Sequence, residues 1–366
     1  MNRLKQLVAI LLNPTDDLEQ SHGALEAAGV PVSFADCRNC PNPCEDGHEE
    51  YPHRIASMID RTSEMLGSVR PYRRQVVIST GKSDWKRSVT SEQGSLASYL
   101  AAIEGAAPTT LTGFSTPGTL PGTPNSTSLH LPNAVAGIFK DSETHVVSIL
   151  NGSHDTLSKH YDHETVLIFP DYKVVAEVPR SLDGARDLWR NSVNPSVSRQ
   201  GSSSGSSAVK SWVIPYACVI LICSHRRRDA RCAVVAPKLE YAFSETLERE
   251  GWDVHTQLDD PTGPPLEDFA DGYEKEAELN RRLQELDNGL AKRALVLKTS
   301  HIGGHKYAGN VIIYMPQGAG VWYGRVSTHE VEPIVRTTIL GGQILPPLLR
   351  GGVNLARPDC KRLNDW

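Results

Sequence analysis

Two pairs of residues in the C-terminal half have types and spacing that could bind a metal. Cys223 and Cys232 are separated by eight residues in a charged segment, and His301 and His305 are separated by three. Thiolate and imidazole ligands together are typical of zinc, copper and iron–sulfur sites. Taken alone, the cysteines are typical of buried apolar residues and the histidines need have no shared role. The hypothesis of a metal site therefore requires that the two pairs lie close together in space.

The elements expected around the two pairs would bring them together. A β-branched run at 212–223 predicts a strand that ends at the first cysteine, and residues 294–299 predict a strand that ends before the first histidine. Loops that leave neighbouring strands at the same edge of an α/β sheet lie close together, and ligands bind at that edge. We therefore expect the two thiols and the two imidazoles to be neighbours.

The other elements of this half are predicted from periodicity and caps. We expect a helix at 237–250, a strand at 252–256, and a hairpin from 311–315 and 321–326. Ser327 and Glu330 have the spacing of a capping box before a last helix. The order is β-α-β, an insertion, then β-β-β-α, which fits a thioredoxin-like α/β domain.

Three details bear on the choice of metal. The spacing of the cysteines is longer than the knuckle of structural zinc and suits a larger two-iron unit. Gly303 and Gly304 argue against a helix between the histidines and allow close backbone approach. The arginines in this segment add positive charge that lowers thiol pKa values, at positions 226, 227, 228 and 231. These residues justify a Cys2His2 metal site, and the wide spacing and the glycines favour a two-iron cluster in it.

Two longer motifs resemble a known family. The segment 300–314, SHIGGHKYAGNVIIY, together with Cys223-x8-Cys232, resembles the fungal sucrase/ferredoxin-like family, and so do TGKSDW at 80–85 and FPDYKV at 169–174. The resemblance implies a thioredoxin-like ferredoxin domain with a [2Fe–2S] cluster. By position, it implies ligation by Cys223, Cys232, His301 and His305. Imidazole ligation raises the potential of such a centre and predicts a potential that falls with rising pH.

The length of 366 residues predicts two domains, and the pattern of strands and helices predicts the α/β class. We expect an N-terminal α/β domain at 1–195 with a disordered loop near 105–133, and a Ser/Gly linker at 196–208. The thioredoxin-like domain would cover 209–350 with an acidic insert near 259–292, and a tail would follow at 351–366. The N-terminal strands are predicted at 75–80, 145–150, 164–169 and 172–178, and the helices at 18–28, 54–66 and 91–103.

The composition excludes several classes. A net charge of −5 gives no basic footprint for nucleic acid, and no apolar run reaches the roughly 20 residues of a membrane span. Seven cysteines, an odd number, do not predict a disulfide framework. We expect a cytoplasmic protein, with a mitochondrial location as the alternative because residues 1–12 contain Arg3 and Lys5 and no acid.

A second cluster of candidate ligands lies near the N-terminus. Cys37, Cys40, Cys44 and His48 fall within twelve residues and could hold zinc, although Pro41 and Pro43 favour a stiff loop. Exposure to solvent is expected for His225 and for the histidines at 154, 160 and 163.

The leading functional hypothesis is a one-electron carrier that serves electron transfer or redox homeostasis and quality control. The alternatives are a zinc-stabilised interaction module and a thiol-redox catalyst on a thioredoxin-like scaffold. An electron carrier is favoured over an enzyme with its own substrate, and its partner would be another redox protein. Trp366 after Asp365 resembles the short tails by which iron–sulfur proteins reach the cluster-targeting machinery, although Asn364 departs from the usual aliphatic residue.

Overall fold

The computed structural model describes residues 14–35, 47–106, 134–202, 209–270, 272–287 and 292–366. The expected targeting segment at 1–12 and most of the expected loop at 105–133 lie outside the described residues, as does much of the expected linker.

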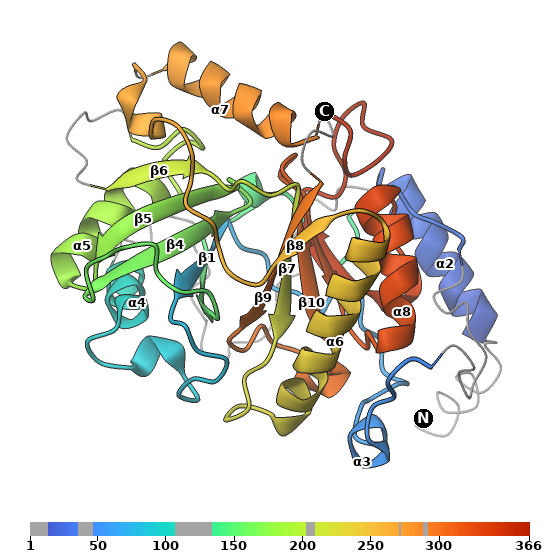
Figure 1. Cartoon of the computed structure of the whole chain (residues 1–366). Coiled ribbons are helices and arrows are strands. Elements are labelled where there is room, and N and C mark those ends of the chain that lie inside the picture. Colours follow the sequence, from blue (N-terminus) through green and yellow to red (C-terminus); the bar gives the residue numbers. More distant parts are fainter. Residues whose placement is uncertain (1–13, 36–46, 107–133, 203–208, 271, 288–291) are drawn as a thin grey trace, which may run out of the picture.

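The strands of the described residues form one mixed sheet (Figure 1). Their order is β2-β12-β11-β10-β7-β9-β3-β1-β4-β5-β6, and β8 also pairs with β9. The strands are β1 Arg74–Ser79, β2 Ile138–Phe139, β3 Val147–Gly152, β4 His163–Phe169, β5 Lys173–Pro179, β6 Lys210–Val213, β7 Cys218–Cys223, β8 Asp253–His255, β9 Arg293–Thr299, β10 Val311–Tyr314, β11 Gly320–Tyr323 and β12 Leu349–Val353. The helices are α2 Pro14–Ala27, α3 His53–Ala56, α4 Leu96–Ala106, α5 Leu182–Leu188, α6 Ala230–Arg249, α7 Tyr273–Asp287 and α8 Thr328–Pro333.

The middle of this sheet contains two units with the same topology. In the first unit, β1 is parallel to β3 and antiparallel to β4, and β5 follows β4. In the second unit, β7 is parallel to β9 and antiparallel to β10, and β11 follows β10. Helix α4 connects the parallel strands of the first unit, and α6 follows β7 in the second. Helices α5 and α8 come after the last strands, so each unit reads β-α-β-β-β-α, apart from β2 in the first and β8 and α7 in the second.

The two units meet where their parallel pairs end. Gly152 of β3 and Thr299 of β9 pair in antiparallel orientation, so the sheet order is palindromic about this contact. Within the units, Ser79 pairs with Gly152 and Cys223 pairs with Thr299. By register, Ser79 therefore corresponds to Cys223, and His154 corresponds to His301.

The sheet crosses the expected domain boundary. Strand β6, which follows the expected linker, pairs with β5 before it, and β2 from the N-terminal half pairs with β12 at the opposite edge. One apolar core cluster likewise contains residues from both halves, such as Val77 and Ile220. The mixed α/β class is as expected, whereas the division into two domains stays a prediction.

Most strands lie where the sequence predicts them. The hairpins β4–β5 and β10–β11 are confirmed, and Ser327 and Glu330 form the predicted capping box at the start of α8. The element order of the second unit is also as expected, with α7 inside the acidic insert.

Four predicted elements are wrong in extent. The helix expected at 54–66 is limited to α3, and α4 starts only at Leu96. The strand expected at 212–223 is split into β6 and β7, with Pro215 in the break, because proline cannot donate a ladder hydrogen bond. Helix α6 begins at Ala230, well before Pro237, because the Asp229 side chain accepts the Arg231 N–H as an N-cap.

The C-terminal segment expected as a tail is partly integrated in the fold. Strand β12 crosses the boundary at 350, and Leu363 is buried. Among the described residues, no helix combines the length and apolar character that a membrane crossing requires.

Candidate metal centre at the ends of β7 and β9

The four predicted ligands lie at the carboxyl ends of two adjacent strands in the middle of the sheet. Cys223 is the last residue of β7, and His301 and His305 follow β9, its parallel neighbour. The two imidazole centroids are 5.5 Å apart. Cys232 lies in the first turn of α6 rather than in a loop, since that helix starts early. The expectation that the segments after these two neighbouring strands begin at the same end of the sheet is confirmed.

The two thiols share a buried, polar environment. Cys223 is 2% exposed and Cys232 is 1% exposed. A hydrogen bond with Cys232 lowers the pKa of Cys223 well below its usual value, and His301 acts in the same direction. The pKa of Cys232 is raised by that hydrogen bond and by burial. The hydrogen bond between the two thiols therefore favours the charged form of Cys223 and the neutral form of Cys232.

The donor set fits a metal in chemistry but does not converge on one point. Nδ1 of His301 is buried and has no hydrogen-bond partner among the described residues, which costs free energy unless something binds it. Within the described ranges, no three His, Cys, Asp or Glu side chains are arranged to hold a single metal ion. A two-iron cluster needs two ligands at each of two positions, so it does not require three donors around one point.

His225 positions the first histidine of the pair. It is buried, so the expectation that it is solvated is wrong. Its Nδ1 accepts the backbone N–H of His301 at 3.2 Å, which leaves the proton on Nε2. That nitrogen donates to the carbonyl of Trp85 at 2.9 Å. Both ring nitrogens are therefore used, and His225 supports His301 rather than serving as a ligand.

The TGKSDW segment at 80–85 supports the cysteine loop from the first unit. Ser224 Oγ donates to the Ser83 carbonyl at 3.2 Å, and the Arg227 N–H donates to Asp84 Oδ1 at 3.0 Å. Together with the contact between His225 and Trp85, these bonds join the loop after β1 to the loop after β7. The N-terminal motif therefore has a structural role at this site.

Arg350 is a buried cation beside the thiols that sequence reasoning missed. It lies on β12 and is 1% exposed, and burial lowers its pKa to about 10, so it stays charged at neutral pH. It donates to Asn310 Oδ1 at 2.7 Å and to the Gly303 carbonyl at 3.3 Å. Negative charge on Cys223 and on Cys232 raises the pKa of Arg350 and so opposes the effect of burial. No motif surrounds Arg350 in the sequence, so only the pairing of β12 with β11 reveals it.

The same arginine explains the two glycines between the histidines. Gly303 and Gly304 have φ values of +82° and +64°, in the left-handed region. A Cβ atom on Gly304 would lie 2.4 Å from a guanidinium nitrogen of Arg350. Asn310 Nδ2 donates to the Gly304 carbonyl at 3.0 Å and fixes the loop from the other side.

The outer side of the site is open and basic. His305 is exposed, and so are Arg226, Arg227 and Arg228, which we call the basic rim. Burial lowers the pKa of His305, and Arg228 acts in the same direction while Asp229 opposes it. Arg231, expected to act on the thiols, is paired with Asp229 at 2.7 Å.

The other candidate residues that the structure describes do not join this site. Cys37, Cys40 and Cys44 lie outside the described residues, and the ring of His48 packs edge-on against His329 at 5.2 Å. His154 is completely buried rather than exposed, because it follows β3 as His301 follows β9. His160 is exposed as expected, and His163 is only partly so.

Comparison with known proteins identifies relatives of this chain. It is 33% identical over 136 residues to altered inheritance of mitochondria protein 32 of Meyerozyma guilliermondii, which covers 37% of this chain and 35% of that protein. It is 32% identical over 122 residues to actin patches distal protein 1 of Saccharomyces cerevisiae, which covers 33% and 29%. The chain thus spans about a third of the length of these relatives.

No solved structure matches the chain significantly. The sequence model of the sucrase/ferredoxin-like family matches residues 65–351, which includes both units and all four predicted ligands. The chain belongs to the sucrase/ferredoxin-like family.

Proposed function

We propose that this protein carries a [2Fe–2S] cluster on Cys223, Cys232, His301 and His305 and acts as a one-electron carrier in electron transfer or redox homeostasis. The observation that carries the proposal is that two donors lie together at the ends of β7 and β9: Cys223, whose thiol pKa is lowered, and Nδ1 of His301, which is buried and has no hydrogen-bond partner among the described residues. When bound, the cluster supplies one-electron chemistry. In this proposal the second unit is a thioredoxin-like ferredoxin domain, supported by its β-α-β-β-β-α order.

The residues around the ligands have defined tasks in this proposal. His225 holds the His301 backbone, and Arg350 supplies a fixed positive charge that offsets the charge of the thiolates. The apolar core beneath Cys223 keeps water from the inner side. His305, at the exposed side, is the ligand closest to solvent and therefore the natural exit for an electron.

The basic rim supports a partner with an acidic surface. The chain has a net charge of −5. The three exposed arginines of the basic rim therefore form a local positive patch on a protein that is negative as a whole. Complementary charge raises the rate of encounter and fixes orientation. We propose a redox protein with carboxylates around its own centre as the electron partner.

The C-terminal tail and the compartment remain further parts of the proposal. Trp366 is 47% exposed, which supports recognition by the iron–sulfur targeting machinery. Asp365, however, accepts the backbone N–H groups of Lys361 and Arg362 at 2.7 and 2.8 Å, so a receptor that reads its carboxylate must release it first. We propose a cytoplasmic location, with the mitochondrion as the alternative that the names of the relatives suggest.

A thiol-redox catalyst is the second candidate, because Cys223 and Cys232 are close enough to share a proton. Their burial disfavours it, since a disulfide substrate would have to reach thiols that are 2% and 1% exposed. A zinc-stabilised interaction module is the third candidate.

Metal content and visible absorption test the proposal. We expect the full chain, purified without oxygen, to be red-brown and to contain about two irons and two sulfides per chain and no zinc. Cys223→Ser should lose the colour, whereas Cys218→Ala, five residues earlier on the same strand, should keep it. A colourless protein with one zinc would establish the interaction module, and a metal-free dithiol would favour the thiol catalyst.

A further inference from the structure

A cavity of about 440 Å³ lies in the first unit. Its lining comes from the end of β1, the end of β3, the first turn of α4 and the loop between β3 and β4. In the second unit, the corresponding elements carry Cys223, Cys232 and the two histidines. The cavity therefore lies at the same end of the first unit as the candidate metal centre does in the second, although neither Ser79 nor His154 lines it.

The side chains at these equivalent positions do not suit a metal. Ser79, which corresponds to Cys223, donates to Glu164 at 3.1 Å and accepts the Thr165 N–H at 2.8 Å. His154, which corresponds to His301, is buried away from the cavity lining. The first unit thus has a hollow near these positions and no thiol at them, which points to a small molecule rather than a metal as its occupant.

Two groups in the cavity wall have no partner in the part of the chain that the structure describes. Asn151 is only 5% exposed, and no hydrogen bond is formed by its side-chain amide, although the residue lines the cavity. Lys82 also lines the cavity and is exposed; among the described residues its ammonium forms no ion pair within 4 Å, although its charge lowers the pKa of the nearby Glu164. The first turn of α4, at Leu96 and Ala97, adds backbone N–H groups at the positive end of a helix dipole.

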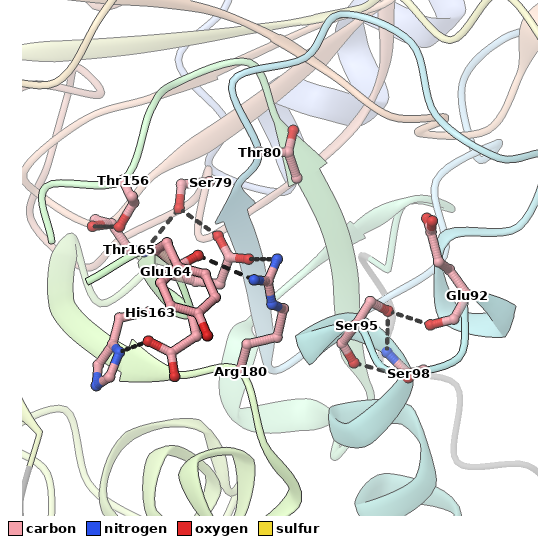
Figure 2. A network of polar contacts seen from close by, with 12 residues as sticks. Ser79, Thr80, Glu92, Ser95, Ser98, Thr156, His163, Glu164, Thr165 and Arg180 are labelled. Carbon is pink, nitrogen blue, oxygen red and sulfur yellow. Dashed lines mark hydrogen bonds and ion pairs between the residues drawn. The ribbon is translucent and has the colours of Figure 1, made fainter. Parts of the chain in front are cut away.

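Two of the three carboxylates in the cavity lining have partners already, as Figure 2 shows for Glu164. Glu164 is hydrogen-bonded to Ser79 and lies 3.4 Å from Arg180, and burial raises its pKa. Glu92 pairs with Lys86 at 3.3 Å. Only Asp155, at the exposed mouth, remains. Among the described residues, the groups of the cavity that remain available are thus the Lys82 ammonium, the Asp155 carboxylate at the exposed mouth, the Asn151 amide and the start of a helix.

We propose that this cavity binds a small organic molecule through a carboxylate or phosphate group, with Lys82 and the start of α4 facing the charge and the Asn151 amide bonding to a neighbouring polar group. The site does not depend on the metal centre, so it can be tested on protein with or without iron. It lies close to that centre, because the Asn151 backbone bonds to Ser300, the residue before His301.

Calorimetric titration of the full chain with inorganic phosphate and with succinate tests the proposal. At least one probe should bind saturably with one site per chain. Lys82→Gln should weaken binding at least tenfold, which is about 1.4 kcal/mol. The matched control is Lys159→Gln, which removes an exposed lysine of the same unit outside the cavity and should leave the affinity unchanged.

The outcomes separate the possible ligands. Binding of phosphate alone indicates a phosphate-bearing molecule, and binding of succinate alone indicates a carboxylate. Asn151→Asp places a negative charge in the wall and should abolish binding of either probe, with thermal unfolding as the check that the variant folds. Absence of binding by both probes at millimolar concentration, or equal weakening by Lys82→Gln and Lys159→Gln, overturns the proposal.

Discussion

Ser153 and Ser300 make the same pair of hydrogen bonds across the junction of the two units. Ser300 Oγ accepts the Asn151 N–H at 3.0 Å, and the Ser300 N–H donates to the Asn151 carbonyl at 2.8 Å. Ser153 Oγ accepts the Lys298 N–H at 3.0 Å, and the Ser153 N–H donates to the Lys298 carbonyl at 2.9 Å. Such reciprocity is what two units related by a local two-fold axis produce, and it fixes the ends of β3 and β9 together.

Ser300→Ala should destabilise the protein more than Ser153→Ala. Both remove an acceptor from a backbone N–H, but Ser300 is buried whereas Ser153 is partly exposed, so water can replace only the latter. An unsatisfied buried N–H costs about 1–3 kcal/mol. Urea unfolding measures the difference, with the exposed Ser196→Ala as control. Equal stability of Ser300→Ala and wild type would show that the junction does not need this bond.

Gly304→Ala should cost more stability than Gly251→Ala. Both glycines have positive φ, at +64° and +79°, so alanine pays about 1–2 kcal/mol for the left-handed backbone at either position. Only at Gly304 does the new methyl group meet Arg350, since nothing lies within 4 Å of a Cβ on Gly251. The excess loss in chemical denaturation reports the displacement of Arg350. If both variants lose the same free energy, the close approach of Arg350 is not a constraint.

Arg350→Gln should lower the midpoint potential of the iron-loaded protein. Reduction adds negative charge next to a buried cation, and removal of that cation disfavours the reduced state. We expect a shift on the order of 60 mV, which corresponds to about 1.4 kcal/mol for one electron. Voltammetry at fixed pH measures it, and Arg281→Gln on α7 controls for net charge. An unchanged potential in a variant that retains its iron would contradict this role.

Stability should fall below pH 6.5 because of His154. Burial lowers its pKa to about 4 from the ordinary 6.5, and neither ring nitrogen has a hydrogen-bond partner among the described residues. As the pH falls, the imidazole is protonated first in the unfolded chain. The contribution of neutral His154 to the free energy of unfolding is therefore complete above pH 6.5 and is lost as the pH falls toward 4. Between pH 7 and pH 5 the loss is about 2 kcal/mol. Unfolding of His154→Phe should show a smaller pH dependence than wild type, whereas exposed His160→Gln should behave as wild type.

Charge reversal of the basic rim should invert the preference for small oxidants. Ferricyanide is an anion, so it should oxidise the reduced protein faster at low salt than at high salt, and a cationic cobalt complex should show the opposite trend. With Arg226, Arg227 and Arg228 replaced by Glu, the two trends should exchange. Stopped-flow rates at two ionic strengths provide the measurement, and unchanged salt dependence would exclude the rim from the electron route.

The sequence was sufficient to predict that the four candidate ligands lie near one another. Strand β7 is apolar throughout and half of its residues are β-branched, and β9 is mainly aliphatic, so their burial and their parallel pairing followed from the pattern. The capping box at Ser327 and the hairpin turns were readable because they depend on adjacent residues. Such features depend on local geometry, which a single sequence carries.

The features that could not be predicted depend on pairing over long distances. The correspondence of His154 with His301 is invisible in the sequence, because the units share register and topology rather than residues. The role of Arg350 follows from the position of β12 in the sheet, and the roles of His225 and Trp85 follow from contact between two loops. The prediction of a helix at 54–66 is wrong because the apolar residues there, such as Met65, are buried although the backbone that carries them is irregular.

The position of Arg350 late in the chain has a consequence for biogenesis. During synthesis on a ribosome, the cysteines and histidines emerge well before the strand that carries this arginine. Until β12 joins β11, the thiols lack their fixed countercharge and the glycine loop lacks its support. Metal delivery during translation would therefore meet an unfinished pocket, and insertion after the ribosome has passed Arg350 is the order of events that this fold favours.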